Sequence, residues 1–352
     1  MKPALKFSEQ DWQNLSQNWI AWWTGQLERP LVIIENRPRS RTVYELTIQF
    51  LRDQPVDNLL DFYNDHLSNT ILYGDAFPRW FPFFGAGVVA AFLGAKLLCT
   101  PEEGTIWFTP DKPLESYDLT GHYNPHNPWW QRIREITRAA AELWGDRLSI
   151  GFTDLGGNLD ILASLRGSQE VLTDLLDCPE QIESACQQIT QLWLQYYQDL
   201  LEITGNRGRG STPWAPIWAP GSCYMLQSDF SAMISPKMFE RFVIPDIVAC
   251  SRQMDYAFYH LDGKGQLPHL DLLLAIEELQ GIQWIPGDGQ PPPEDWLPVL
   301  DRIRQAGKLC QLFVSEAGAR KITRQLGGKG FAFYITDRLS SQAAQSLLSE
   351  LT

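Results

Sequence analysis

The chain has 352 residues and a formal net charge of −13, from 29 basic and 42 acidic side chains. This acidic balance argues against broad contact with nucleic acid or with an anionic membrane surface. The apolar stretch 83–98 is interrupted by three glycines and Lys96 and is shorter than a bilayer span. The six cysteines form no Cys-x-x-Cys pair, so we expect reduced thiols in a cytoplasmic protein without membrane association.

The first 127 residues predict a helical and hairpin extension together with the first strand. The elements expected here are a helix over the first 25 residues, where tryptophans recur at helical spacing, a buried strand over 31–35, a helix over 58–72 and a hairpin over 96–109 around Glu103-Gly104.

From residue 128 onward, short apolar strands alternate with helices. The expected strands lie within 148–157, 215–221, 257–263, 282–289, 309–315 and 331–337, and the expected helices cover about 128–145, 168–177, 180–204, 236–252, 268–279, 294–306 and 317–326, with one more at the end. This rhythm is typical of βα units around a parallel sheet. We expect one domain, residues 1–352, with the regular units in 128–352.

Carboxylates follow five of these strands: Asp154, Asp262, Asp288, Glu316 and Asp337. In an α/β barrel the active site lies at the carboxyl ends of the strands, so this set is a candidate site. The alternative is that Asp-Gly pairs only end strands and begin turns.

Three stretches of the chain carry a family resemblance: 74–96, 153–182 and 228–247. The last contains Asp-x-x-x-x-Ile-Ser-Pro-x-x-Phe-x-x-Phe-x-x-Pro, beginning at Asp229. Over residues 20–350 the chain resembles the uroporphyrinogen decarboxylase superfamily. That superfamily includes the decarboxylase itself and corrinoid-dependent methyltransferases that feed coenzyme M. The resemblance implies a TIM (β/α)8 barrel with an N-terminal helical extension.

The decarboxylase branch carries Arg-x-x-Gly-Arg near its N-terminus, which grips the carboxylates of the tetrapyrrole. Here the early arginines Arg37, Arg39 and Arg41 lie in a segment without that glycine. Tetrapyrrole decarboxylation is therefore expected less than the methyl transfer of the other branch. A further alternative is a non-catalytic protein that binds a corrinoid or a porphyrin.

The methyltransferase branch binds zinc through a His-x-Cys motif at the end of one strand and a Cys at the end of the last strand. The matching positions here are His260-x-Asp262 and Asp337, so both cysteines are replaced by aspartate. One imidazole and two carboxylates suit Zn²⁺, and equally Mn²⁺ or Fe²⁺. Glu316 or water would supply a fourth ligand. The alternative is that His260 and Asp262 bond each other without a metal.

The triplet His-Leu-Asp occurs twice, and the two copies have different expected roles. In a strand, His260 and Asp262 face the same way. The second copy, His269 and Asp271, follows Pro268 at the start of a helix, and its side chains diverge around the axis. We expect His269 to support the site or cap the helix.

The resemblance thus favours a corrinoid-linked methyltransferase that acts on a small molecule, with a corrinoid protein as partner. Its catalytic candidates are Asp154, Asp229, His260 and Asp288. Aromatic side chains suit a flat or apolar substrate, and the candidates to line the pocket are Trp80, Phe81, Trp218, Tyr259, Trp284 and Tyr334. We expect Asp262, Asp288 and Asp337 to converge at one mouth beside His260, with Asp154 across the pocket.

Overall fold

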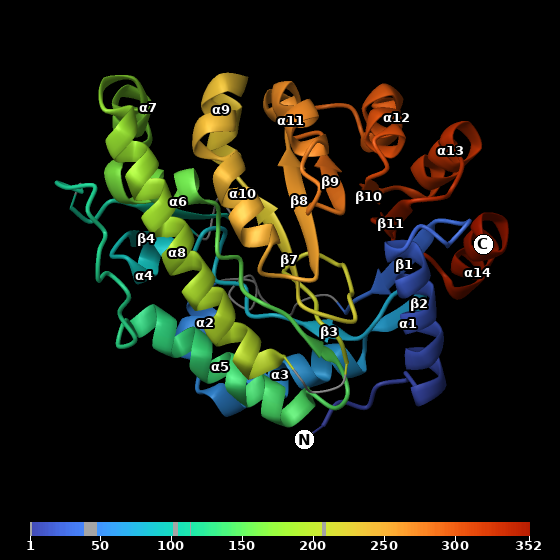
Figure 1. The fold of residues 1–352 in the computed structure, drawn as a ribbon. Coiled ribbons are helices and arrows are strands. Elements are labelled where there is room, and N and C mark those ends of the chain that lie inside the picture. Colours follow the sequence, from blue (N-terminus) through green and yellow to red (C-terminus); the bar gives the residue numbers. More distant parts are fainter. Residues whose placement is uncertain (1, 39–47, 101–104, 113, 206–208) are drawn as a thin grey trace.

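The computed structural model describes residues 2–38, 48–100, 105–112, 114–205 and 209–352 (Figure 1). It is a mixed α/β fold around a seven-stranded sheet in the order β2-β1-β11-β10-β9-β8-β7. The strands are β1 (Leu31–Asn36), β2 (Ile71–Gly74), β7 (Cys223–Gln227), β8 (Tyr256–Asp262), β9 (Gly281–Ile285), β10 (Leu309–Val314) and β11 (Phe331–Ile335). Neighbouring strands are parallel except β1 and β2.

Two smaller sheets complete the described strands. The short strands β3 (Arg79–Trp80) and β6 (Ser149–Ile150) pair in parallel, and β4 (Lys96–Thr100) pairs with β5 (Thr105–Thr109) as the predicted hairpin. Among the described residues no ladder joins the β3–β6 pair to the large sheet. The hydrogen bonding therefore shows a parallel sheet, and the closed barrel stays a prediction.

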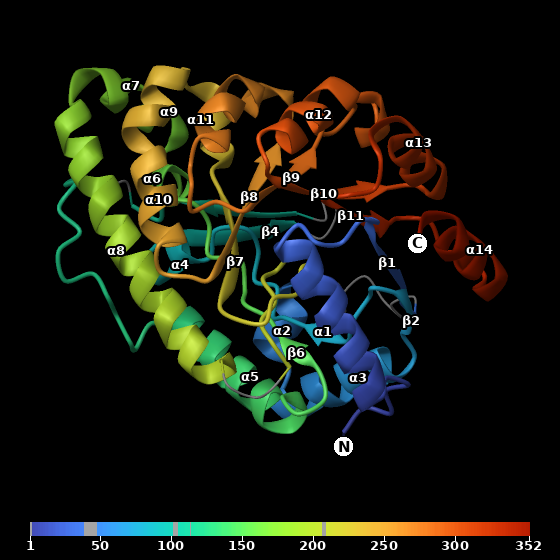
Figure 2. The same ribbon diagram turned by 45° about the vertical axis from the view of Figure 1, so that its right-hand side comes forward.

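Helices that follow the strands lie around the outside of the sheet (Figures 1 and 2). Their bounds are α1 (Glu9–Trp23), α2 (Ile48–Asp53), α3 (Val56–Ser68), α4 (Val89–Phe92), α5 (Pro128–Trp144), α6 (Asn158–Arg166), α7 (Ser168–Asp177), α8 (Pro179–Thr204), α9 (Pro236–Phe242), α10 (Ile244–Ser251), α11 (Leu270–Leu274), α12 (Leu297–Gln305), α13 (Glu316–Leu326) and α14 (Ser341–Leu351), with 3-10 turns η2 (Asp229–Met233), η3 (Lys264–His269) and η4 (Pro293–Asp295). None of the described helices is long and apolar enough to span a bilayer.

The tryptophans of helix α1 pack against the sheet near the amino end of β8. Trp22 stacks on Phe258 of β8, with ring centroids 5.8 Å apart, and Trp23 packs on Tyr256. Because side chains alternate along a strand, His260 and Asp262 share the face of Phe258. That face is apolar beside α1 and becomes polar toward the carboxyl end of β8.

Proline accounts for two departures from the predicted elements. Residues 215–221 are not a strand: Pro216 and Pro220 lack the N–H that a ladder needs, and the strand β7 begins at Cys223. The helix predicted over 236–252 is divided at Val243, because Pro245 cannot donate a helical hydrogen bond. Arg39, Arg41 and the turn at Glu103-Gly104 lie outside the described residues.

Candidate metal centre

Three predicted side chains meet at the carboxyl ends of β7 and β8. Asp229, His260 and Asp262 each offer one ligand atom, and these atoms all lie within 4.8 Å of one another. Nε2 of His260 is 3.9 Å from Oδ2 of Asp262. The sheet register explains why they meet. Gln227 of β7 pairs with His260 of β8. Asp229 follows Gln227 by two residues, and Asp262 follows His260 by two residues, so both aspartates lie just beyond this pair.

His260 is held from its other ring nitrogen. Nδ1 meets Oε1 of Gln283 on β9, and Nε2 of Gln283 donates to Oε1 of Gln311 on β10. Trp214 packs edge-on against the imidazole, with centroids 5.1 Å apart. Because Gln283 presents its acceptor oxygen, Nδ1 is the donor in this hydrogen bond, and Nε2 is the ring nitrogen left to face the two aspartates.

The donor atoms of this group suit a divalent cation. One imidazole and two carboxylates are ligands of Zn²⁺, Mn²⁺ and Fe²⁺. A neutral His260 with a free Nε2 is the ligand form of the ring, and its hydrogen bond to Gln283 is the kind of support that fixes a metal-binding histidine. Asp229, His260 and Asp262 could therefore hold a divalent metal ion.

Two further carboxyl groups adjoin this cluster. Burial raises the pKa of Asp154 to about 7, with a smaller contribution from the charge of Asp229. Burial and the Asp229 charge also raise the pKa of Asp160 to about 7, although the backbone N–H groups of Phe230 and Asp229 donate to it at 2.6 and 3.1 Å. Burial likewise raises the pKa of Asp229 against the opposing effect of His260. Asp154 and Asp160 therefore titrate near neutral pH.

Asp154 begins the segment Asp154-Leu155-Gly156-Gly157, whose glycines permit close packing. A Cβ on Gly156, at φ +85°, would lie 2.5 Å from Cα of Gly87, and one on Gly157 would lie 2.2 Å from the carbonyl oxygen of Gln227. The side chain of Gln227 in turn donates to Asp154 at 3.2 Å. Glycine here lets two loops meet beside the cluster.

A cavity of about 270 Å³ opens at Asp229. Asp160, Gln227 and Asp229 line one side of it. The rest is mainly apolar and includes Ala86, Ile106, Trp107, Phe108, Phe230 and Met233. Most of this apolar wall comes from the hairpin strand β5 and from η2, so these elements shape the space next to the carboxylates.

The other predicted metal ligands take part in different contacts. The carboxylate of Asp337 accepts from the backbone N–H of Glu316 at 2.7 Å, at the start of α13. Glu316 pairs with Arg320 on the next turn. Asp288 is exposed in the turn after β9. The structure does not bring Asp337, Glu316 or Asp288 into the group of Asp229, His260 and Asp262.

The predicted aromatic residues are divided among three places. Tyr259 and Trp284 are fully buried in the core between the sheet and its outer helices. Trp218 lies in the cluster beneath α1, where its carbonyl accepts from Trp23. Trp80 and Phe81 line a separate cavity near β1, and Tyr334 donates to Glu35 at 3.3 Å beside it.

In the second His-Leu-Asp copy, His269 contacts the turn η2 that carries Asp229. Nε2 of His269 bonds the carbonyl of Ser231 at 2.8 Å, and its ring stacks on Phe239 at 4.3 Å. Burial lowers the pKa of His269. Ser231 belongs to η2, which begins with Asp229, so His269 steadies that turn. Asp271 points outward and pairs with Arg302.

Several contributors were not among the predicted site residues, among them Asp160, Gln283 and Gln311. The glutamines had a sequence signal, because each is the one polar residue inside an otherwise apolar strand. Asp160 lies in α6, a helix that the strand–helix pattern did not predict.

In comparisons with known proteins, no family model matches the chain and no curated protein matches its sequence.

Proposed function

We propose that the protein is a metal-dependent enzyme of the uroporphyrinogen decarboxylase superfamily that transfers a methyl group in partnership with a corrinoid protein. The observation that carries the proposal is the convergence of Asp229, His260 and Asp262. The resemblance of the stretches 74–96, 153–182 and 228–247 supports the family, and His260-x-Asp262, at the positions that match the zinc ligands of the methyltransferase branch, supports the type of reaction.

The charge around the cluster supports a cation. Besides burial, the charge of Asp229 raises the pKa values of Asp154 and Asp160, and the charge of Asp262 raises the pKa of Asp229. His260 is the basic member of the three-residue group. When bound, Zn²⁺ or a similar ion would act as a Lewis acid that activates the acceptor by lowering its pKa.

The protein's own groups then bind, orient and exchange protons. Gln283 orients His260 toward the aspartates. Asp154 and Asp160, with pKa values of about 7, are suited to accept or donate a proton at neutral pH. The apolar wall formed by Ile106, Trp107 and Met233 would exclude water and receive the apolar part of a small substrate.

Metal analysis tests the first part of the proposal. Untagged protein purified without chelator should contain a divalent metal, or take up Zn²⁺ or Mn²⁺ in calorimetric titration. Asp262→Asn should weaken that binding. The matched control is Asp271→Asn, the same change in the second His-Leu-Asp copy, which should leave metal binding unchanged. A wild-type protein that neither contains nor binds a metal would overturn the metal role.

Methyl transfer tests the second part. Metal-loaded protein incubated anaerobically with methylcobalamin and a thiol should change the cobalamin spectrum as the methyl group leaves. Conversion of uroporphyrinogen in a parallel assay would instead establish the decarboxylase alternative. Tight cobalamin binding without turnover would establish a binder.

A further inference from the structure

A second cavity, of about 200 Å³, lies beside β1 and β3. This volume is far above the roughly 10–15 Å³ that one water requires. Its wall includes Glu35, Arg37 and Arg79, with His66 and the aromatic side chains of Tyr63, Phe77, Trp80 and Phe81. None of its lining residues belongs to the cavity at Asp229.

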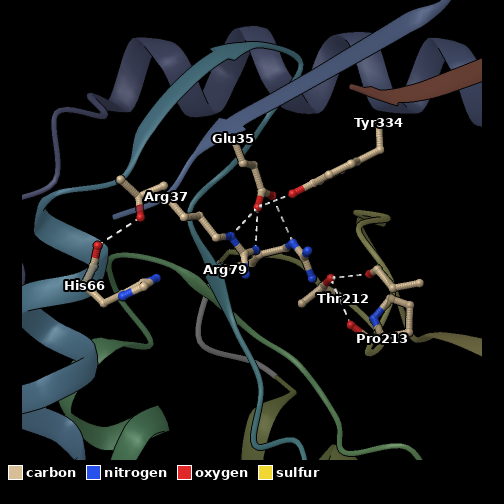
Figure 3. A network of polar contacts seen from close by, with 9 residues as sticks. Glu35, Arg37, His66, Arg79, Thr212, Pro213 and Tyr334 are labelled. Carbon is tan, nitrogen blue, oxygen red and sulfur yellow. Dashed lines mark hydrogen bonds and ion pairs between the residues drawn. The ribbon is translucent and has the colours of Figure 1, made fainter. Parts of the chain in front are cut away.

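Glu35 is the centre of the polar network in this cavity (Figure 3). Its side chain is 1% exposed and accepts from Nε of Arg79 at 3.1 Å and from Nε of Arg37 at 2.8 Å. Tyr334 donates to it at 3.3 Å. Burial would raise the pKa of Glu35, but the two guanidinium groups outweigh burial and hold that pKa below its ordinary value. Glu35 is therefore ionised.

Arg79 has more hydrogen-bonding capacity than Glu35 satisfies. Its side chain is 7% exposed, and its buried Nη1 has no hydrogen-bond partner among the residues that the structure describes. Two guanidinium groups face one carboxylate, so these three described groups together carry one excess positive charge. A buried cationic N–H without an acceptor is costly. An anionic oxygen in the cavity would remove that cost.

We propose that Arg79 and Arg37 form a binding site for the anionic oxygens of a ligand, carboxylate or phosphate, in the cavity beside β1 and β3. The planar guanidinium fork matches either group through paired N–H donors. Glu35 holds both arginines in place, and the aromatic wall receives the body of an organic acid. The site shares no lining residue with the cavity at Asp229.

Calorimetric titration of the full-length, chelator-treated protein at low ionic strength tests the site with two probes, benzoate and inorganic phosphate. At least one should bind saturably with a Kd below about 10 mM. Binding of benzoate alone identifies an organic acid site, binding of phosphate alone a phosphate site, and binding of both a general anion site. Binding of neither would overturn the proposal. Because the chelator removes bound metal, this titration does not depend on the metal centre. The result would stand even if the proposed metal site proved wrong.

Substitutions then locate the binding. Arg79→Met should weaken it at least about tenfold by removing a charge-assisted donor. Glu35→Gln should tighten it, because the competing carboxylate is gone. The control is Arg209→Met, which removes a guanidinium of comparable burial that is already paired with Glu9, and it should have little effect. Equal weakening by Arg209→Met would overturn the site.

Arg37→Met provides a second route if Arg79→Met does not fold. Its side chain is 44% exposed, so the substitution should be tolerated. Weaker binding of the same probe is expected, and unchanged binding in both folded arginine variants would contradict the proposal.

Discussion

Gln283 joins His260 on one side to Gln311 on the other, so three neighbouring strands share one line of side-chain hydrogen bonds. The imidazole cannot turn without breaking that line. Its free Nε2 is therefore directed at Asp229 and Asp262 before any ligand arrives.

Gln283→Leu should weaken metal binding by about 10–100-fold, the usual effect of removing a group that orients a ligating histidine. The measurement is calorimetric titration with Zn²⁺, together with nitrogen NMR of the histidine tautomer. Gln311→Leu is the control, because Gln311 contacts Gln283 but not His260, and its effect should be smaller. Unchanged affinity in Gln283→Leu would show that the ring is oriented by other contacts.

Asp154→Asn should stabilise the protein at high pH. The raised pKa of Asp154, about 7, means that the folded state binds more protons than the unfolded state between about pH 4 and 7. The contribution of Asp154 to the free energy of unfolding of the wild type is full below about pH 4 and is lost as pH rises through 7. Asparagine avoids this loss and still accepts from Gly156 and Gln227, so the gain should be up to about 4 kcal/mol at pH 8.

Urea unfolding from pH 5 to 8 measures this difference. The gap between Asp154→Asn and wild type should widen with pH and level off above about pH 8. A gap that is constant over the whole range would mean that Asp154 does not titrate differently in the folded state.

Asp262→Asn should leave folding stability unchanged or higher in chelator, because it removes a charge that repels Asp229. Asp271→Asn, in the second copy of the triplet, should lose at most about 1 kcal/mol, as expected for an exposed ion pair; the side chain of Asp271 is 84% exposed. Thermal unfolding of both variants decides the matter. Marked destabilisation by Asp262→Asn would argue for a structural role.

Trp22→Ala should cost about 3–5 kcal/mol, because the indole is fully buried and stacks on Phe258. Trp107→Ala is the matched control: that indole is 60% exposed, and its loss should change the free energy of unfolding by about 0.5 kcal/mol or less. Urea unfolding of the two variants compares them directly. Equal effects would contradict the packing described for α1.

The alternation of apolar strands with helices predicted the sheet because local periodicity reports burial directly. The helix at 168–177 and the hairpin at 96–109 are confirmed at their predicted places. The strand predicted within 148–157 is present as β6, although only Ser149 and Ile150 pair. The short strand β3 was not predicted, since two paired residues leave no periodic pattern.

His260 and Asp262 were predicted together because spacing of two places side chains on one face of a strand. Asp337 was assigned as their partner from the family resemblance and the phase of the last strand, and neither reveals that its carboxylate accepts from the first turn of α13. The joining of Asp229 to His260 depends on the register between β7 and β8, a relation between distant segments that one chain's local pattern does not contain.

The pairing of residue 31 with residue 332 has a consequence for synthesis. β1 is synthesised about 300 residues before its partner β11, so the ladder between them cannot form while the intervening segment is being made. Until then, one edge of β1 and the apolar surface that Ala332 helps to bury under α1 are open to other chains. Long-range pairing of this kind slows folding and exposes the nascent protein to aggregation, so chaperones should decide its yield in the cell.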